Sequence, residues 1–593
     1  MTVALNYEQL VSQTFRDNAI RSVMMIDDHF IPYPNLIDLL ANKEEVSEEQ
    51  LITSQRAANL EKFFQNEKIL CDIDNSLSHI DIDRIRKSDL LIIDYYLEHE
   101  SPERTLNILC GLKDSSHFNL AVVYTSNNLD QVWMEIASSF TKIKDIDAQI
   151  DEIDDLDDFW SDTILPSIQL STEYSLSNSD LVDYLRTGKL KGSLLKQLST
   201  TPFKSYKQQI CKIIYDYYIK QYQIIKSPGN KELTVQGDSN GNTWIKSGNV
   251  FICLYQKTID DIEQDPKKIW ETLQISLVDW KPSYYQLIQS EIQNHIESDS
   301  MAFNTIHDND KHGHAAWLQE ILKAKNHSES LQLIRSIYAD VSEELSFKFN
   351  KNEELRTFIE LTFSYYREKF TSSADNDPAK FCSGIMGLPF DVNKTPKDMY
   401  HALNMHMSSK NYQNEYISTG TIFKTISRHN DSDNPGTWYL CVSAACDMIP
   451  NQANDPYNDR LAPHRLIRVL QLFPTNQDTA IKFATHSKYV YAYDNGERKY
   501  FSILNESSNV PWIDYMVIKN HADKLNRTEI PLIIFAKGSE GEIVMKEILV
   551  KPKSQLRVGY AERYQSIAAQ HGARIGVDYI NSDIGVTDKL KLF

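Results

Sequence analysis

The run Leu90-Leu91-Ile92-Ile93 is followed directly by Asp94. Four consecutive apolar residues between polar neighbours are typical of a short strand that is buried on both faces of a parallel sheet. A carboxylate that follows such a strand would lie at the carboxyl edge of the sheet, where open α/β sheets hold their ligands. We therefore expect Asp94 to lie in a crevice at one edge of a parallel sheet.

The first 160 residues alternate between strand and helix patterns. Helical patterns at about 51–66, 80–87, 106–112 and 128–140 separate strand patterns at 22–26, 68–72, 90–93, 120–126 and, weakly, 141–145. This alternation predicts an α/β fold with a doubly wound, five-stranded parallel sheet. The polar stretch that begins Ile31-Pro32-Tyr33-Pro34 predicts a loop, part of an insertion at about 31–55.

Polar residues follow three of the predicted strands. Asp27 and Asp28 follow the first, Asp94 the third and Thr125 ends the fourth. In a parallel sheet these side chains converge at one edge, where gathered carboxylates repel one another unless a hard cation such as Mg²⁺ neutralises them. A carboxylate beside Mg²⁺ can act as a nucleophile towards a phosphoryl group.

This arrangement resembles the receiver domain of two-component response regulators, and the interval between Asp94 and Thr125 is close to the family's usual spacing. The resemblance implies a flavodoxin-like fold in which Asp94 accepts a phosphoryl group from a sensor histidine kinase. It also implies that Asp28 binds Mg²⁺ directly, Asp27 binds it through water, and the backbone carbonyl of Tyr96 completes the protein ligands. Thr125 would be the switch hydroxyl.

The sequence departs from the receiver pattern at the phosphate-binding lysine, because the expected Lys-Pro pair after the fifth strand is absent. Lys144 is the candidate by spacing, and Lys142 is the next. Both lie in the weak fifth strand pattern.

Beyond residue 160, we expect a mainly helical region at 161–410 and a β-rich domain at 411–593. The helical region contains a predicted hairpin at 233–256 with its turn at Asn240-Gly241-Asn242. The C-terminal pattern predicts strands at 420–426, 437–444, 487–493, 499–504, 530–536 and 542–550, and a helix at 558–571.

The C-terminal region carries a segment ending in Cys446-Asp447 and a tail from Arg557 to Tyr579. These segments resemble large receiver proteins of bacterial anti-phage systems of the Detocs type, which implies a partner effector protein with its own receiver. No nuclease, phosphorylase or cyclase motif follows residue 200, which favours the non-effector member. We expect no separate catalytic domain, and at most self-phosphorylation from a kinase donor and autodephosphorylation.

Two other clusters could hold a metal ion or a nucleophile. Cys446 could act with Cys441 or His464, although small cysteines packed in a β core are the simpler interpretation. A second group comprises His307, His312 and His314. The simpler interpretation of this group is a polar loop that precedes a helix at 315–323.

Composition narrows the function classes. A net charge of −20 argues against a large nucleic-acid footprint. Scattered cysteines without a CxxC pair, no apparent signal peptide and no apolar run of membrane-spanning length predict a cytoplasmic protein. Two alternatives remain: a DNA-binding response regulator that uses the hairpin at 233–256, and a phosphoryl-transfer hydrolase.

Overall fold

The computed structural model describes most of the chain, namely residues 6–42, 48–75, 82–97, 101–113, 118–226, 236–237, 243–258, 261–298, 310–324, 327–414, 416–426, 436–449, 458–494, 497–521 and 528–572. The chain divides into two compact units. One comprises residues 1–302 with 349–369, and the other comprises 303–348 with 370–593.

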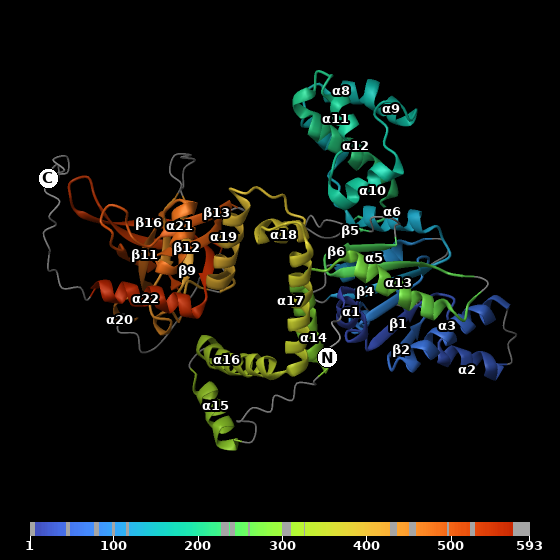
Figure 1. The fold of residues 1–593 in the computed structure, drawn as a ribbon. Coiled ribbons are helices and arrows are strands. Elements are labelled where there is room, and N and C mark those ends of the chain that lie inside the picture. Colours follow the sequence, from blue (N-terminus) through green and yellow to red (C-terminus); the bar gives the residue numbers. More distant parts are fainter. Residues whose placement is uncertain are drawn as a thin grey trace. The chain divides into compact units, whose positions relative to one another are not determined.

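The first unit is built on a seven-stranded sheet with the order β2-β1-β3-β4-β7-β6-β5 (Figure 1). Its strands are β1 (Ser22–Ile26), β2 (Leu70–Asp74), β3 (Leu90–Ile93), β4 (Asn119–Thr125), β5 (Gln236–Gly237), β6 (Trp244–Ser247) and β7 (Val250–Gln256). The first five in spatial order are parallel, in the arrangement of flavodoxin-like folds. β6 and β5 extend the sheet in antiparallel pairing.

Both faces of this sheet are buried, as the apolar runs predict. Alternate residues of β3 enter two separate hydrophobic cores, with Leu91 and Ile93 in one. Leu90 and Ile92 lie in the other. Because successive side chains of a strand point to opposite faces, a continuous apolar run is what a sheet covered on both sides requires.

The helices of the first unit connect and cover the strands (Figure 1). They are α1 (Tyr7–Ser12) with the π-helical turn η1 (Gln13–Asp17), α2 (Tyr33–Asn42), α3 (Glu48–Asn66), α4 (Ile82–Ile85), α5 (Glu103–Lys113), α6 (Leu129–Phe140), α13 (Asp265–Trp280), α14 (Tyr284–Ser298) and α17 (Glu353–Ser372).

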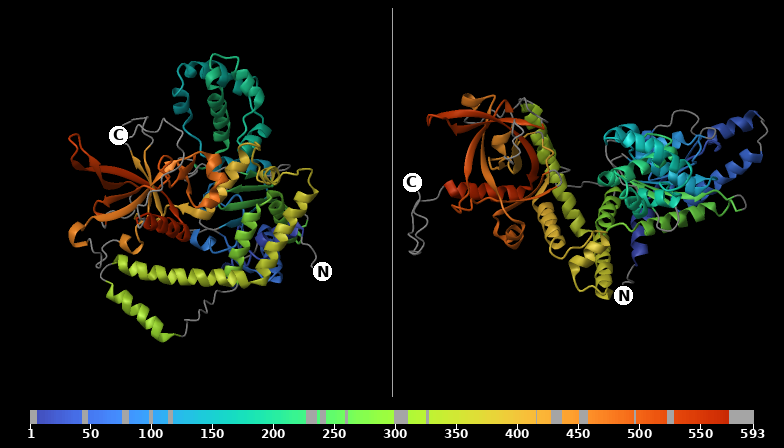
Figure 2. Two further views of the ribbon diagram at one scale, coloured as in Figure 1. Left: turned by 60° about the vertical axis from the view of Figure 1, so that its left-hand side comes forward. Right: turned by 90° about the horizontal axis from the view of Figure 1, so that it is seen from above.

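A helical lobe is inserted between β4 and β7. It comprises α7 (Ile146–Asp151), α8 (Leu156–Phe159), η2 (Trp160–Ile164), α9 (Leu165–Gln169), α10 (Asn178–Thr187), α11 (Gly192–Leu198), η3 (Lys204–Tyr206) and α12 (Lys207–Tyr222). The lobe projects from the sheet in Figures 1 and 2. Its core is continuous with one face of the sheet, since Ile150 and Ile214 share a hydrophobic cluster with Val123.

Two local predictions differ from the structure. The stretch expected to be a loop forms α2, in which Pro34 lies in the first turn, where a missing N–H costs the helix nothing. The expected turn at residues 240–242 lies outside the described residues, and Trp244 to Tyr255 is not one strand. It is two, β6 and β7, joined at Gly248-Asn249, with Gly248 at a φ of 54°.

The second unit contains a closed β-barrel. Six antiparallel strands pair in the ring β10-β9-β16-β15-β14-β11, which the pairing of β10 with β11 closes. Its strands are β8 (Ser409–Asn411), β9 (Thr421–Ile426), β10 (Trp438–Cys441), β11 (Arg465–Pro474), β12 (Tyr489–Asp494), β13 (Glu497–Ser502), β14 (Ile513–Ile518), β15 (Ile530–Lys537) and β16 (Ile543–Leu556). The helices are α15 (Lys311–Lys323), α16 (His327–Lys351), α18 (Pro378–Ile385), α19 (Thr395–Ser408), η4 (Cys446–Met448), α20 (Asn458–Leu461), α21 (Gln477–Lys482), η5 (Ala484–His486) and α22 (Val558–Gly572).

The β-rich C-terminal region was predicted, with six of its strands and the final helix. The sequence patterns missed the short β8 as well as β11 and β14. In β11, Arg465, Arg468 and Gln471 interrupt the apolar residues at every third position, and β14 carries Asp514 near its start. Closure of the barrel depends on these two strands, because β11 links β14 to β10.

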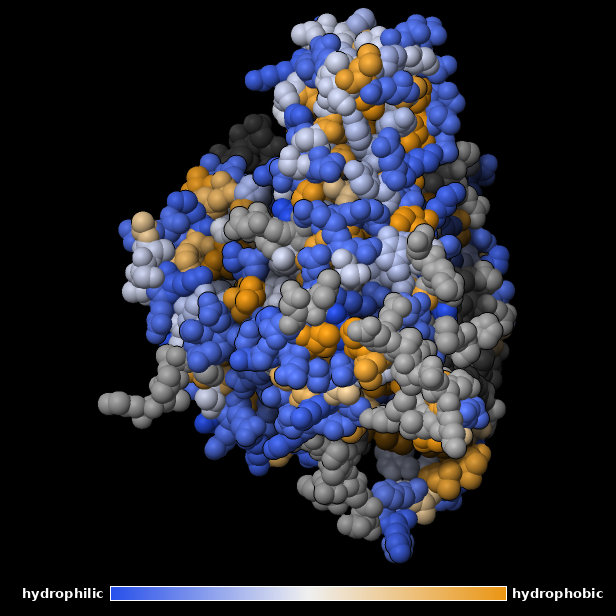
Figure 3. Space-filling model, turned by 90° about the vertical axis from the view of Figure 1, so that its right-hand side faces the viewer, coloured by the Kyte–Doolittle hydropathy of each residue, from blue (hydrophilic) through white to orange (hydrophobic). Residues whose placement is uncertain are grey.

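Among the described residues, none of the helices combines the length and apolar character needed to cross a membrane. On the face drawn in Figure 3, hydrophilic residues predominate and apolar residues lie in small, scattered groups.

Candidate functional site

Three carboxylates meet at the carboxyl edge of the parallel sheet. Asp27 and Asp28 follow β1, and Asp94 follows β3, which is paired with β1 in register. One ligand oxygen from each lies within 4.8 Å of the others. The register of two adjacent parallel strands therefore brings together residues that are 66 positions apart in the sequence.

The backbone and its neighbours hold Asp94 in place. Its amide donates to the carbonyl of Ile26 at 2.9 Å, and the hydroxyl of Thr105 donates to its carbonyl at 2.9 Å. The Tyr95 amide donates to Oδ1 of Asp94 at 2.8 Å. The side chain of Asp94 is 12% exposed, so it can be reached from solvent while most of it is covered.

The lysine at this edge is Lys257, the first residue after β7. Its Nζ lies 2.8 Å from Oδ2 of Asp27 and 3.1 Å from Oδ2 of Asp94. The strand that carries it pairs with β4, and the Lys257 amide donates to the carbonyl of Thr125 at 2.7 Å. One ammonium group thus pairs with two of the three carboxylates.

The ionisation of these groups reflects burial and mutual charge. Burial raises the pKa of Asp94 to about 6; Lys257 acts to lower it and Asp27 to raise it. Burial would lower the pKa of Lys257, but the attraction of Asp27 and Asp94 outweighs it, and the pKa lies above its ordinary value. Burial also raises the pKa of Asp28, with Asp27 acting in the same direction.

The donor set suits a hard divalent cation. Oδ1 of Asp28 is buried and has no hydrogen-bond partner among the residues that the structure describes, and Nε2 of His29 lies 3.7 Å from it. A buried carboxylate oxygen without a partner is costly, and a bound cation would supply one. All three candidate ligands offer oxygen atoms, which Mg²⁺ prefers.

The structure places Thr125 and Tyr96 at the same edge. Thr125 ends β4, is buried, and accepts a hydrogen bond on Oγ1 from the Asn127 amide at 3.2 Å. The hydroxyl hydrogen can still be donated. Tyr96 lies two residues after Asp94 with its ring 5.1 Å from that of Tyr95. Its role as a carbonyl ligand stays a prediction.

The expectation that Lys144 ends a fifth strand is wrong. Residues 142–145 form no strand, Lys144 is exposed, and the next helix, α7, begins at Ile146. The fifth parallel strand is β7, more than a hundred residues further along the chain, because the helical lobe intervenes. A signal was present: Val250 to Leu254 is an apolar run like that before Asp94, and a charged residue follows it at Lys257.

A buried polar network borders Lys257. Asp265 accepts hydrogen bonds from Tyr124 at 2.5 Å, Arg56 at 3.2 Å and Thr258 at 2.5 Å. Arg56 also donates to the carbonyl of Thr258 at 2.5 Å. Nζ of Lys257 lies 5.2 Å from the centre of the Tyr124 ring, within cation–π range. The network ties α3, β4 and α13 together beside the carboxylates.

Residues 19–172 match the family model of the response receiver domain. The N-terminal region contains a receiver domain. The match ends inside the helical lobe, so β7 and Lys257 lie beyond it. No curated protein and no solved structure matches the chain.

Among the residues that the structure describes, the members of the other candidate clusters do not come together. Within the described ranges, Asp27, Asp28 and Asp94 are the one group of three or more acidic, histidine or cysteine residues close enough to share a metal ion. Cys441 is buried in β10, where burial raises its pKa to about 11, and Cys446 is exposed.

Histidines elsewhere are accounted for by local structure. His312 and His314 lie in the first turn of α15, and His307 lies outside the described residues. Nδ1 of His464 accepts a hydrogen bond from the Asn520 amide at 3.0 Å.

Proposed function

We propose that this chain is a response-regulator-like signalling protein that accepts a phosphoryl group on Asp94 from a histidine kinase. The observation that carries the proposal is the placement of Asp94 beside Asp27, Asp28 and Lys257 in a receiver domain. In the transfer, a carboxylate oxygen of Asp94 bonds to the phosphorus of a phosphohistidine. The P–N bond breaks, and the imidazole, protonated on its other nitrogen, leaves with the electron pair.

The neighbouring residues have separable roles in this proposal. Asp27 and Asp28, with Asp94, would hold Mg²⁺, which offsets charge on the transferring oxygens when it is bound. Lys257 would pair with the phosphoryl oxygens on Asp94. These contacts would replace part of its present ion pairing with the carboxylates. The Thr125 hydroxyl, at the end of the adjacent strand β4, would donate a hydrogen bond to the phosphoryl group.

The hairpin does not support the DNA-binding alternative. β7 is the fifth parallel strand of the receiver sheet and β6 is its antiparallel neighbour, and most of their side chains are buried, so the hairpin is an integral part of the sheet rather than a projecting reader. The kinase partner, the effector partner and an anti-phage setting stay predictions from the resemblance.

Phosphorylation by a small donor tests the proposal. We expect phosphoramidate with Mg²⁺ to add one phosphoryl group to the wild type, detected by intact mass, and none to Asp94→Asn. Asp74→Asn is the matched control, since Asp74 ends β2 at the same sheet edge but pairs with Arg84 at 2.7 Å. Equal labelling of Asp94→Asn and the wild type would reject Asp94 as the acceptor.

A further inference from the structure

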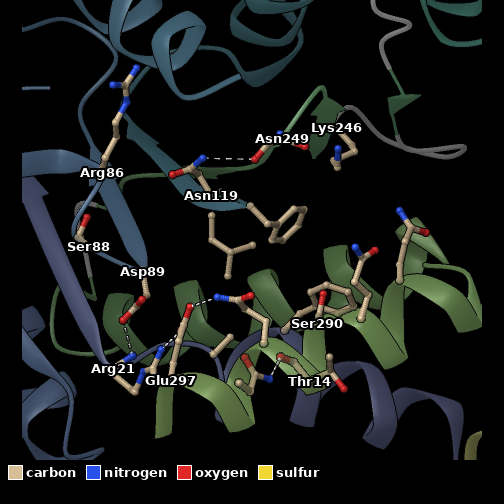
Figure 4. Close-up of a pocket in the computed structure, with 18 of the residues that line it drawn as sticks. Thr14, Arg21, Arg86, Ser88, Asp89, Asn119, Lys246, Asn249, Ser290 and Glu297 are labelled. Atoms are coloured by element: carbon tan, nitrogen blue, oxygen red, sulfur yellow. Dashed lines mark hydrogen bonds and ion pairs between the residues drawn. The ribbon is translucent and has the colours of Figure 1, made fainter. Parts of the chain in front are cut away.

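A cavity of about 680 Å³ lies in the first unit at the edge of the sheet opposite Asp94. The residues that begin the strands line one side of it, including Arg21 before β1, Asp89 before β3 and Asn119 in β4, and α14 lines the other (Figure 4). Its volume is in the range of small-molecule sites, about 300–1,000 Å³. The proposed phosphoacceptor function does not use this edge.

One wall of the cavity is aromatic. The rings of Phe118 and Trp280 are stacked, with centres 5.7 Å apart and planes 12° from parallel, and Phe15 packs against both at 5.5 and 5.3 Å. Phe118 is 39% exposed, so part of its side chain remains accessible beside these contacts. A flat, polarisable group is the natural complement to such a surface.

The lining is positively charged, although the protein as a whole carries a net charge of −20. Four basic side chains line the cavity, against two acidic ones: Arg21, Arg86, Lys87 and Lys246, with Asp89 and Glu297. Both acidic groups have partners within the wall. Asp89 accepts from the Ser22 hydroxyl at 2.9 Å and from two backbone amides, and Glu297 pairs with Arg21. The surplus of positive charge favours an anionic ligand.

Lys246 joins the charged and aromatic parts of the lining. Its Nζ lies 5.7 Å from the centre of the Phe118 ring and 5.9 Å from that of Trp280, and donates to the carbonyl of Gly248. Burial lowers its pKa to about 8, so a bound anion would relieve the cost of its charge.

Side-chain amides supply the remaining polar lining, from Asn119, Asn249, Gln286, Gln289, Gln293 and Asn294. Each amide carries both a donor and an acceptor. Most of them are already engaged, since Asn119 and Asn294 donate to backbone carbonyls, Gln286 accepts from Ser283 and Gln293 donates to Glu297. The exposed amide of Gln289 on α14 offers a donor and an acceptor to the edge of a heterocyclic base. An aromatic surface, an exposed side-chain amide and excess positive charge therefore lie in one cavity.

We propose that this cavity binds a nucleotide, with the base against Phe118, its edge near the Gln289 amide on α14, and the phosphate near Lys246. The site is separate from the proposed phosphoacceptor. The same strands that begin at the cavity end at Asp27, Asp94, Thr125 and Lys257.

Isothermal titration calorimetry of the full-length protein with AMP, GMP, CMP and UMP tests the proposal, with the matching nucleosides and inorganic phosphate as comparisons. We expect at least one nucleotide to bind at one site per chain, and its nucleoside and phosphate alone to bind at least about tenfold more weakly. Lys246→Met should weaken that binding about tenfold or more. Lys267→Met, on α13 and outside the cavity lining, should leave it unchanged.

A second variant keeps the test decisive if Lys246→Met folds poorly. Gln289 is exposed on α14, so Gln289→Glu should fold normally and weaken nucleotide binding by adding negative charge to the lining. The proposal is overturned if no nucleotide binds at about 1 mM, if phosphate alone binds as well as nucleotides, or if both lining variants bind like the wild type. Asp94→Asn should bind nucleotide normally; loss of binding there would place the ligand at the other edge.

Discussion

Replacing Lys257 with methionine removes the ammonium group that pairs with Asp27 and Asp94 while keeping a side chain of similar length. The ion pair between Nζ and Oδ2 of Asp94 spans 3.1 Å. With an effective dielectric constant of about 20, two charges at that distance attract by about 5 kcal/mol. Since one pKa unit corresponds to about 1.4 kcal/mol, the upper limit of the shift is about four units.

Solvent at the partly exposed Asp94 and local rearrangement reduce this limit. We expect the pKa of Asp94 to rise from about 6 by at least about one unit in Lys257→Met, because Asp27 then acts without the opposing lysine. At neutral pH, Asp94 is mostly ionised in the wild type and would be half protonated or more in the variant. The reactive carboxylate would be depleted accordingly.

The assay is the initial rate of labelling by phosphoramidate, followed by intact mass between about pH 5 and about pH 8 at a fixed Mg²⁺ concentration. Mg²⁺ bound beside Asp94 would shift the pH midpoint of labelling downwards in both proteins, so the comparison rests on the difference between their midpoints. We expect the rate to rise with pH in both proteins, with the midpoint for Lys257→Met at higher pH and a lower plateau.

Two controls distinguish the lysine from a general effect on folding. Lys257→Arg retains the charge and should keep its midpoint close to that of the wild type, whereas Lys144→Met should label like the wild type because Lys144 is exposed and outside the sheet. If Lys257→Met has an unchanged profile, or if Lys144→Met loses labelling, the electrostatic reasoning is wrong.

Three further outcomes are expected. Mg²⁺ should raise the melting temperature of the wild type by binding the folded state, and Asp28→Asn should abolish most of that rise; an equal rise in both would exclude Asp28 as a ligand. Asp265→Ala should lower the free energy of unfolding by about 3–5 kcal/mol, because it leaves Arg56 buried without its carboxylate. Asp261→Ala, which breaks an exposed pair, should cost at most about 1 kcal/mol in the same denaturant titration. Without Mg²⁺, the stability of the wild type relative to Asp94→Asn should fall as pH rises from about 4 to about 6, because the pKa of Asp94 in the folded state lies above its ordinary 3.8. If the difference in stability between the wild type and Asp94→Asn does not change across that pH range, burial does not raise the pKa of Asp94.

The carboxylate cluster was predictable because its signal is local. Each strand is a short apolar run that a doubly covered sheet requires, and each carboxylate follows its run directly. Once the strands are parallel, their carboxyl ends meet at one edge whatever the loops between them do. Asp27, Asp28 and Asp94 could therefore be grouped before the structure was known.

Lys257 could not be predicted in that way. The spacing of the receiver pattern assumes that one helix separates β4 from the next parallel strand. Here the helical lobe and the β5–β6 segment lie between them. Only the pairing of β7 with β4 decides which lysine reaches the carboxylates, and pairing between strands so far apart depends on packing rather than on any local pattern.

The same division holds for the rest of the molecule. The sequence alone determined that Asp94 follows a doubly buried strand and that the C-terminal region is rich in β-structure, since apolar periodicity reports burial residue by residue. Tertiary structure decided which distant residues share an edge: Lys257 beside Asp94, Asp265 beside Arg56, and Lys246 beside Phe118. These contacts depend on the order of the strands in the sheet and on the helices that cover it. No local pattern in the sequence encodes that arrangement.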